Sequence, residues 1–133
     1  MRPFEISGGS AGESTILRVT GELDAANATA LRQALAGEIA SSGSVVVDLS
    51  ECDFIDSAGI AAIVEAWQGF DGPASRGKVV LAGPRGQVDR IIRITGLDQN
   101  IAIFDEVEQA VASGDLTRSR SPGEEQRSWD SLR

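Results

Sequence analysis

Residues 45–49 read Val-Val-Val-Asp-Leu, four aliphatic side chains with a single carboxylate among them. This run lacks the polar and apolar alternation of a strand that has one face in water. A continuous apolar run of this length is typical of a strand covered by helices on both faces. The sequence therefore predicts a central strand at residues 45–49, followed by a loop rich in acidic residues.

Strand-like and helix-like patterns alternate on both sides of this run. β-branched and aliphatic residues predict further strands near residues 4–6 and at 16–20, 79–82 and 101–104. Apolar residues at three- and four-residue spacing predict helices at residues 24–39, 57–70, 84–95 and 105–111. The order predicts an α/β fold, with a mixed, largely parallel sheet of about five strands packed with about four helices.

Capping signals mark the expected ends of these helices. Asp24, Ser57 and Asp105 are the expected N-terminal residues, since a side-chain oxygen there can accept a free helical N–H. Gly96 is the expected left-handed residue after the third helix, whose inward positions include Thr95. The patterns end near residue 114, so we predict one domain at residues 1–114.

Residues 115–133 change in character, because Ser, Pro, Gly and charged residues dominate there. We expect a disordered C-terminal tail. The alternative is that Trp129 anchors this tail on a partner.

The composition excludes several classes of function. The chain has no histidine, which removes the Ser/His and Cys/His nucleophile pairs and histidine metal ligands. Cys52 is the only cysteine, so no intrachain disulfide can form and a cytoplasmic location is expected. The net charge of -8 disfavours nucleic acid and membrane surfaces as partners, and no apolar run approaches the roughly 20 residues of a membrane span.

Residues 54–60, Phe-Ile-Asp-Ser-Ala-Gly-Ile, place a serine where a helix begins. Free backbone N–H groups and the helix dipole favour negative charge there, so a phosphate on Ser57 would be tolerated by the fold. The added charge beside Asp56 would still change the surface that a partner meets. The alternative is that Ser57 only caps the helix.

The ordered set of motifs resembles the STAS domain family. The motifs are Gly-Glu-Leu-Asp at residues 21–24, Val-Val-Val-Asp-Leu-Ser at 45–50, the segment at 54–60, and Ile-Thr-Gly-Leu at 94–97. The resemblance spans about residues 4–113 and implies a single STAS-like domain. A chain of this length without other domains looks like an anti-sigma factor antagonist.

The resemblance implies a partner switch rather than an enzyme. The unphosphorylated protein would bind an anti-sigma factor that is also a serine kinase, and phosphorylation by that kinase would end the binding. ATP would belong to the partner, a phosphatase would reset the switch, and the chain itself would need no cofactor or metal. The family's Asp-Ser-x-Gly motif places the phosphorylated serine at Ser57, although Ala58 stands where many members have Ser or Thr. The implied partner face comprises Asp24, Asp56, Ser57, Ala58 and Gly59.

Three alternatives remain open at this point. Asp48 could accept phosphate if it were exposed at the end of its strand, although the other residues of such a site are missing. Asp48, Asp53 and Asp56 could hold Mg²⁺ or Ca²⁺, although their spacing follows no known loop. A STAS-type scaffold, transport-regulating or ligand-binding subunit outside a sigma pathway is the third.

Overall fold

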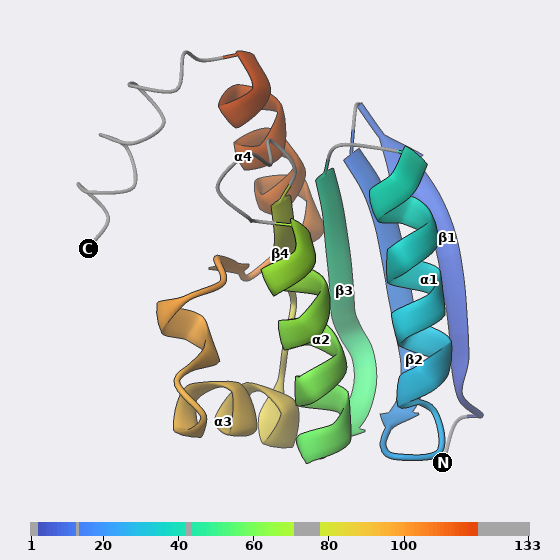
Figure 1. Cartoon of the computed structure of the whole chain (residues 1–133). Helices are drawn as coiled ribbons and strands as arrows, with labels where there is room; N and C mark the ends of the chain where they lie inside the picture. Colours follow the sequence, from blue (N-terminus) through green and yellow to red (C-terminus); the bar gives the residue numbers. More distant parts are fainter. Residues whose placement is uncertain (1–2, 13, 42–43, 71–77, 120–133) are drawn as a thin grey trace.

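A five-stranded sheet with helices on both faces forms the domain (Figure 1). The computed structural model describes residues 3–12, 14–41, 44–70 and 78–119. The strands, in sheet order, are β1 (Glu5–Ala11), β2 (Ser14–Leu23), β3 (Ser44–Ile55), β4 (Lys78–Ala82) and β5 (Ile103–Phe104). The helices are α1 (Ala28–Ser41), α2 (Ser57–Phe70), α3 (Gly86–Ile94) and α4 (Val107–Ser119), with a short 3-10 helix, η1, at Leu97–Gln99.

The sheet is mixed but largely parallel. β1 runs antiparallel to β2, whereas β2 with β3, β3 with β4 and β4 with β5 are parallel pairs. A helix lies in each parallel connection, because a chain must cross the length of the sheet before it can start the next parallel strand. The predicted α/β fold, with five strands and four helices, is confirmed.

The side chains of β3 alternate between two helical layers. Val45, Val47 and Leu49 are fully buried in the main core, to which α1, α2 and α3 contribute. Val46 points to the other face and packs in a smaller cluster with Ala110 of α4. Figure 1 shows α1 and α2 lying along the near face of the sheet. Helical cover on both faces explains why residues 45–49 are almost uniformly apolar.

β3 extends farther than its sequence pattern predicts. It continues to Ile55, whereas we expected an acidic loop after Leu49. The additional residues pair with β2 across shifts in register, and the last pair is Leu23 with Ile55. β4 does not extend beside these additional residues. Its pairing with β3 ends at Ala82, which lies opposite Asp48. A strand segment with only one neighbouring strand tolerates polar residues. The polar residues in this part of β3 are the reason that the sequence pattern did not predict a strand there.

The first strand and the last helix also extend beyond their predicted ranges. β1 continues to Ala11 through a Gly- and Ser-rich stretch, and these residue types rarely indicate a strand. α4 continues to Ser119, so it includes the first residues that we assigned to the tail. The rest of that tail, with Trp129, lies outside the described residues. The boundary after residue 114 stays a prediction.

At the ends of α3 and α4, one prediction agrees with the structure and two differ from it. Gly96 follows α3 with a left-handed φ of 77°, as expected. Thr95, expected to point inward, is exposed, and its hydroxyl donates to the carbonyl one turn earlier at 2.9 Å. α4 begins at Val107, one residue later than a cap at Asp105 would give.

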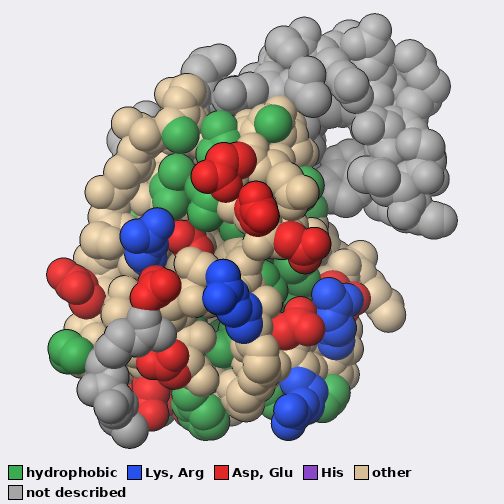
Figure 2. Space-filling model, turned by 180° about the vertical axis from the view of Figure 1, so that it is seen from behind, with side chains coloured by type: hydrophobic (Ala, Val, Ile, Leu, Met, Phe, Trp, Pro, Cys, Tyr) green, Lys and Arg blue, Asp and Glu red, His purple; other side chains and the backbone are tan. Residues whose placement is uncertain are grey.

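Asp48 is buried under an ion pair with the neighbouring strand. Its Oδ2 accepts a hydrogen bond from Nε of Arg18 at 2.9 Å, and its Oδ1 accepts one from the N–H of Ser50 at 3.0 Å. The Asp48 side chain is 1% exposed and that of Arg18 is 54% exposed, so the guanidinium covers the carboxylate and still contacts water. Burial raises the pKa of Asp48, but the hydrogen bonds from Ser50 and Arg18 outweigh it, and the pKa is lowered. Figure 2 shows the molecule from behind, with basic and acidic side chains interspersed over its lower half.

We expect Asp48→Asn to lower the free energy of unfolding by about 1–2 kcal/mol at neutral pH, because hydrogen bonds to the charged carboxylate are weakened. The folded-state pKa of Asp48 lies below its unfolded value, so its stabilisation is present above the unfolded pKa and is lost as the pH falls through the folded pKa. Urea unfolding of both proteins at about pH 7 and about pH 2.5 should therefore show a difference that shrinks in acid. A difference of the same size at both pH values would contradict this assignment.

Candidate functional site

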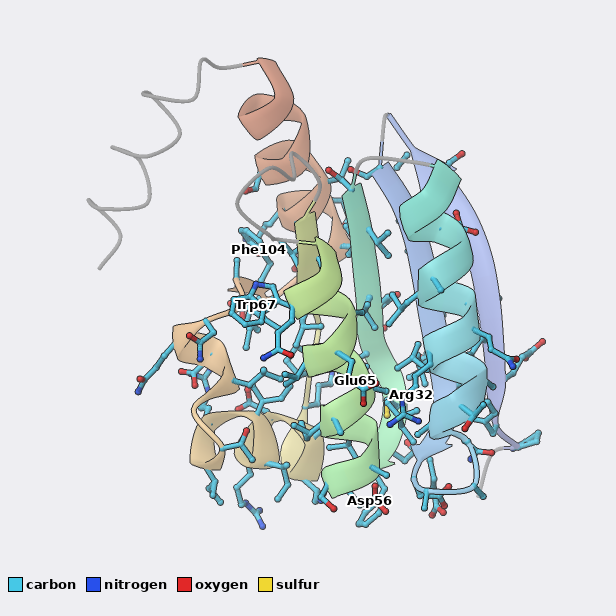
Figure 3. All side chains as sticks on the ribbon, viewed as in Figure 1. Arg32, Asp56, Glu65, Trp67 and Phe104 are labelled. Carbon is cyan, nitrogen blue, oxygen red and sulfur yellow. The ribbon has the colours of Figure 1, made fainter. Side chains whose placement is uncertain are left out.

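β2 and β3 end side by side at one edge of the sheet, and the segments that come after them form the candidate site. Leu23 lies opposite Ile55 in the parallel register. The N–H of Asp56 donates to the carbonyl of Leu23 at 3.2 Å, which joins the start of α2 to the end of β2. Figure 1 shows the loop before α1 and the first turn of α2 at this same edge, where Figure 3 labels Asp56. Asp24, directly after Leu23, is therefore brought beside Asp56.

α2 begins at Ser57, as predicted, but the residue that caps it is Asp56. Oδ1 of Asp56 accepts hydrogen bonds from the N–H groups of Ala58 at 2.9 Å and Gly59 at 3.2 Å. The carbonyl of Asp56 accepts the first helical hydrogen bond, from the N–H of Ile60 at 3.0 Å. The capping role considered for Ser57 is thus filled by its neighbour. Ser57 is the first helical residue and is exposed, so its hydroxyl is not needed to begin the helix.

Asp24 shapes the turn that precedes α1. Its Oδ1 accepts a hydrogen bond from the N–H of Ala26 at 3.1 Å, and its carbonyl accepts one from the N–H of Ala28 at 2.8 Å. Helix α1 begins only at Ala28, so Asn27 directly precedes it and the predicted cap at Asp24 is displaced. The side-chain amide of Asn27 donates to the carbonyl of Glu22 at 2.8 Å and ties the turn back to β2. Asp24 is held by its own turn and remains partly exposed.

Gly59 allows α2 to approach the strand ends closely. A Cβ atom at this position would lie 2.7 Å from the carbonyl oxygen of Leu23 and 2.8 Å from Cγ1 of Ile55. Contacts this short do not fit without movement of the backbone or the core. Gly59 is buried, and Ala58 is partly buried against the same core. Close packing of α2 against the strand ends therefore explains the presence of glycine at this position of the motif, without reference to any partner.

The structure brings the five predicted partner-face residues together, but not all of them reach the surface. Ser57 is exposed, Asp24 and Asp56 are partly exposed, and Gly59 lies beneath them. Phe54 adds an apolar side chain that is 38% exposed, two residues before the capping aspartate. The surface at this end of the sheet thus includes the exposed side chains of Phe54 and Ser57 and the partly exposed carboxylates of Asp24 and Asp56.

Gln87 reaches this edge from α3, and no pattern in the sequence indicated that it would. Its Nε2 donates to the carbonyl of Ile55 at 2.8 Å, and its Oε1 accepts from the N–H of Ile55 at 3.0 Å. A polar residue in the first turn of an amphipathic helix is ordinarily expected to face water. The length of β3 explains the contact, since a strand that extends past its neighbour has backbone groups to satisfy, but that length was itself not evident from the sequence.

The alternative acidic sites do not assemble in the part of the chain that the structure describes. Asp48 lies within β3, buried against Arg18, so it is not an exposed strand-end carboxylate. Among the described residues, no group of three or more His, Cys, Asp or Glu side chains is arranged to hold a metal ion. Cys52 is buried, and its thiol donates to the carbonyl of Phe54 at 3.3 Å. None of the helices within residues 3–12, 14–41, 44–70 and 78–119 has the length and apolar character needed to cross a membrane.

Comparison with known proteins supports the expected fold. Residues 7–110 match the STAS domain family. An anti-sigma factor antagonist from Mycobacterium paratuberculosis has a TM-score of 0.73 and 25% sequence identity, over 85% of this chain and 95% of that chain. TM1081 from Thermotoga maritima, provisionally described as an anti-sigma factor antagonist, has a TM-score of 0.76 and 23% identity, over 83% of this chain and 94% of that chain.

SpoIIAA, an anti-sigma factor antagonist from Bacillus, has the same fold in two states. Its unphosphorylated form has a TM-score of 0.64 and 18% identity, over 89% of this chain and 100% of that chain. Its phosphorylated form has a TM-score of 0.62 and 18% identity, over 84% of this chain and 98% of that chain. The fold also occurs within the murine anion transporter Slc26a9, with a TM-score of 0.66 and 19% identity, over 81% of this chain and 18% of that chain.

We expect Gly59→Ala to destabilise the domain by about 1–3 kcal/mol, because the close contacts with Leu23 and Ile55 outweigh the better helix propensity of alanine. The matched control is Gly37→Ala in α1, where a Cβ atom would have no neighbour within 4 Å. That substitution should stabilise by about 0.5–1 kcal/mol. Chemical denaturation of the two variants measures both effects, and a stabilised Gly59→Ala protein would contradict the packing role.

Proposed function

The chain belongs to the STAS domain family, and we propose that it is a non-enzymatic, cytoplasmic anti-sigma factor antagonist. In its unphosphorylated form it binds an anti-sigma factor that is also a serine kinase, and this binding releases a sigma factor. The kinase uses its own ATP to phosphorylate Ser57, which ends the binding, and a phosphatase restores the binding form. Neither nucleic acid nor membrane is a direct partner.

The exposed position of Ser57, directly after a capping aspartate, is the observation that carries this proposal. Because Asp56 accepts hydrogen bonds from the N–H groups of Ala58 and Gly59, the start of the helix is capped without a hydrogen bond to the serine hydroxyl. The hydroxyl can therefore be modified without removing a cap. The positive end of the α2 dipole lies at the same place and favours an attached phosphate. The fold thus tolerates the modification that the switch requires.

Phosphorylation changes the charge of the partner face rather than the fold. The γ-phosphoryl group of ATP forms a bond to Oγ of Ser57, the bond to ADP breaks, and the hydroxyl proton leaves. The product adds about -1.5 to -2 charges directly after Asp56 and at the same end of the sheet as Asp24, on a chain that already carries a net charge of -8. A kinase surface that fits the small neutral hydroxyl then meets bulk and excess negative charge. SpoIIAA, solved in both unphosphorylated and phosphorylated forms, supports a switch of this kind.

We expect Ser57→Ala to retain affinity for a purified anti-sigma factor kinase but to accept no phosphate, because only the hydroxyl is lost. Ser57→Glu should bind at least about tenfold more weakly, since it places a carboxylate where the neutral hydroxyl docks. Isothermal titration calorimetry with each variant measures the affinities. Equal binding by wild type and Ser57→Glu would rule out the switch.

The matched control is Ser10→Glu, which adds the same charge at an exposed serine of β1. Its affinity should stay within about twofold of wild type, because long-range charge effects are screened at physiological salt.

The purified chain incubated with ATP alone should neither hydrolyse ATP nor phosphorylate itself. Phosphate on Ser57 in the absence of the kinase would contradict the non-enzymatic assignment.

A further inference from the structure

Gln87 is fixed in position by the helix that carries it. It is the second residue of α3, and the next residue, Val88, is fully buried in the main core together with Ile92 of the same helix. The helix therefore cannot shift without disturbing the core. The glutamine side chain extends from this fixed base to the end of β3.

The side-chain amide of Gln87 binds Ile55 as a neighbouring strand would. It donates to the carbonyl of Ile55 at 2.8 Å and accepts from its N–H at 3.0 Å, and we refer to this pair of hydrogen bonds as the amide clasp. A primary amide carries a donor and an acceptor on one planar group, as a peptide unit does. The clasp thus satisfies both backbone groups of one buried residue at once.

The path of β4 explains why a side chain is needed here. β4 pairs with β3 only as far as Ala82 opposite Asp48, and the chain then turns away through Gly83, which has a left-handed φ of 72°. Pro84 is next and has no N–H to offer. On its other side, the end of β3 is held by the hydrogen bond from Asp56 to β2. The amide clasp therefore closes the side that β4 leaves open.

We propose that Gln87 is a positioning residue that orders Asp56 and Ser57 for the partner, an inference that rests on the proposed function. Ile55 directly precedes the capping aspartate, and Ser57 comes directly after that aspartate. If the backbone at Ile55 were mobile, Asp56 and Ser57 would be mobile as well. Binding to the partner would then carry the entropy cost of ordering both residues. With the clasp in place, the hydroxyl and its flanking carboxylate are presented in one arrangement before the partner arrives.

The test compares Gln87→Met, which keeps the length of the side chain but removes both hydrogen bonds, with Gln87→Glu, which keeps only the acceptor at neutral pH. The control is Gln99→Met, the same change at an exposed glutamine in η1. Amide hydrogen exchange should accelerate about tenfold or more at Ile55 and Asp56 in Gln87→Met, and less in Gln87→Glu, while Leu81 in β4 is unchanged. Gln99→Met should leave all three amides at their wild-type rates.

The second readout is phosphorylation of the chain by a purified anti-sigma factor kinase with ATP. The KM for Gln87→Met should rise about three- to tenfold with kcat within about twofold, because an ordering cost is added to binding and not to the chemical step. Unchanged exchange at Ile55, or equal acceleration at Leu81, would overturn the inference, as would an unchanged KM. If wild type itself accepts no phosphate, the proposed function fails, and the exchange rates alone then decide whether the clasp orders this segment.

Discussion

β2 and β3 lie in a parallel register that ends with Leu23 opposite Ile55, and the candidate site consists of the residues directly after each strand. The N–H of Asp56 bonds to Leu23, so the turn that holds Asp24 and the start of α2 share one sheet edge. Gly59 then lets the helix lie directly over the two strand ends. A shift of one residue in this register would turn alternate side chains to the opposite face and separate the members of the site.

In the first turn of α2, capping of the helix and presentation of a hydroxyl to solvent are done by two different residues, although a single serine could have done both. Asp56 holds the helix, and Ser57 presents a hydroxyl to solvent. A serine that capped the helix would have its oxygen engaged by backbone N–H groups, and modification would compete with folding. With a carboxylate as the cap, the proposed phosphorylation of Ser57 would leave the helix cap in place. In the proposed switch, the added phosphate would concentrate negative charge beside Asp56, and this charge would distinguish the two states to a partner.

The sequence predicted those features that depend on periodicity. The buried run at residues 45–49, the start of α2 at Ser57 and the left-handed Gly96 are all consequences of local pattern and backbone chemistry. The end of β3 is not, because residues 50–55 pair on one side only and carry a mixed sequence. The caps were misplaced by one to three positions, since neighbouring polar residues compete for the same N–H groups. Gln87 depends on where β4 stops, which no local pattern contains.

Capture from native cell extract on the unphosphorylated chain, with subsequent ATP addition and phosphosite mapping, tests the proposed switch most directly. The expected result is that the captured protein has serine kinase activity, transfers phosphate to Ser57 and dissociates once ATP is added. The reconstituted pair, purified separately, should behave in the same way. A kinase that stays bound after ATP addition, or phosphate on a residue other than Ser57, would contradict the switch.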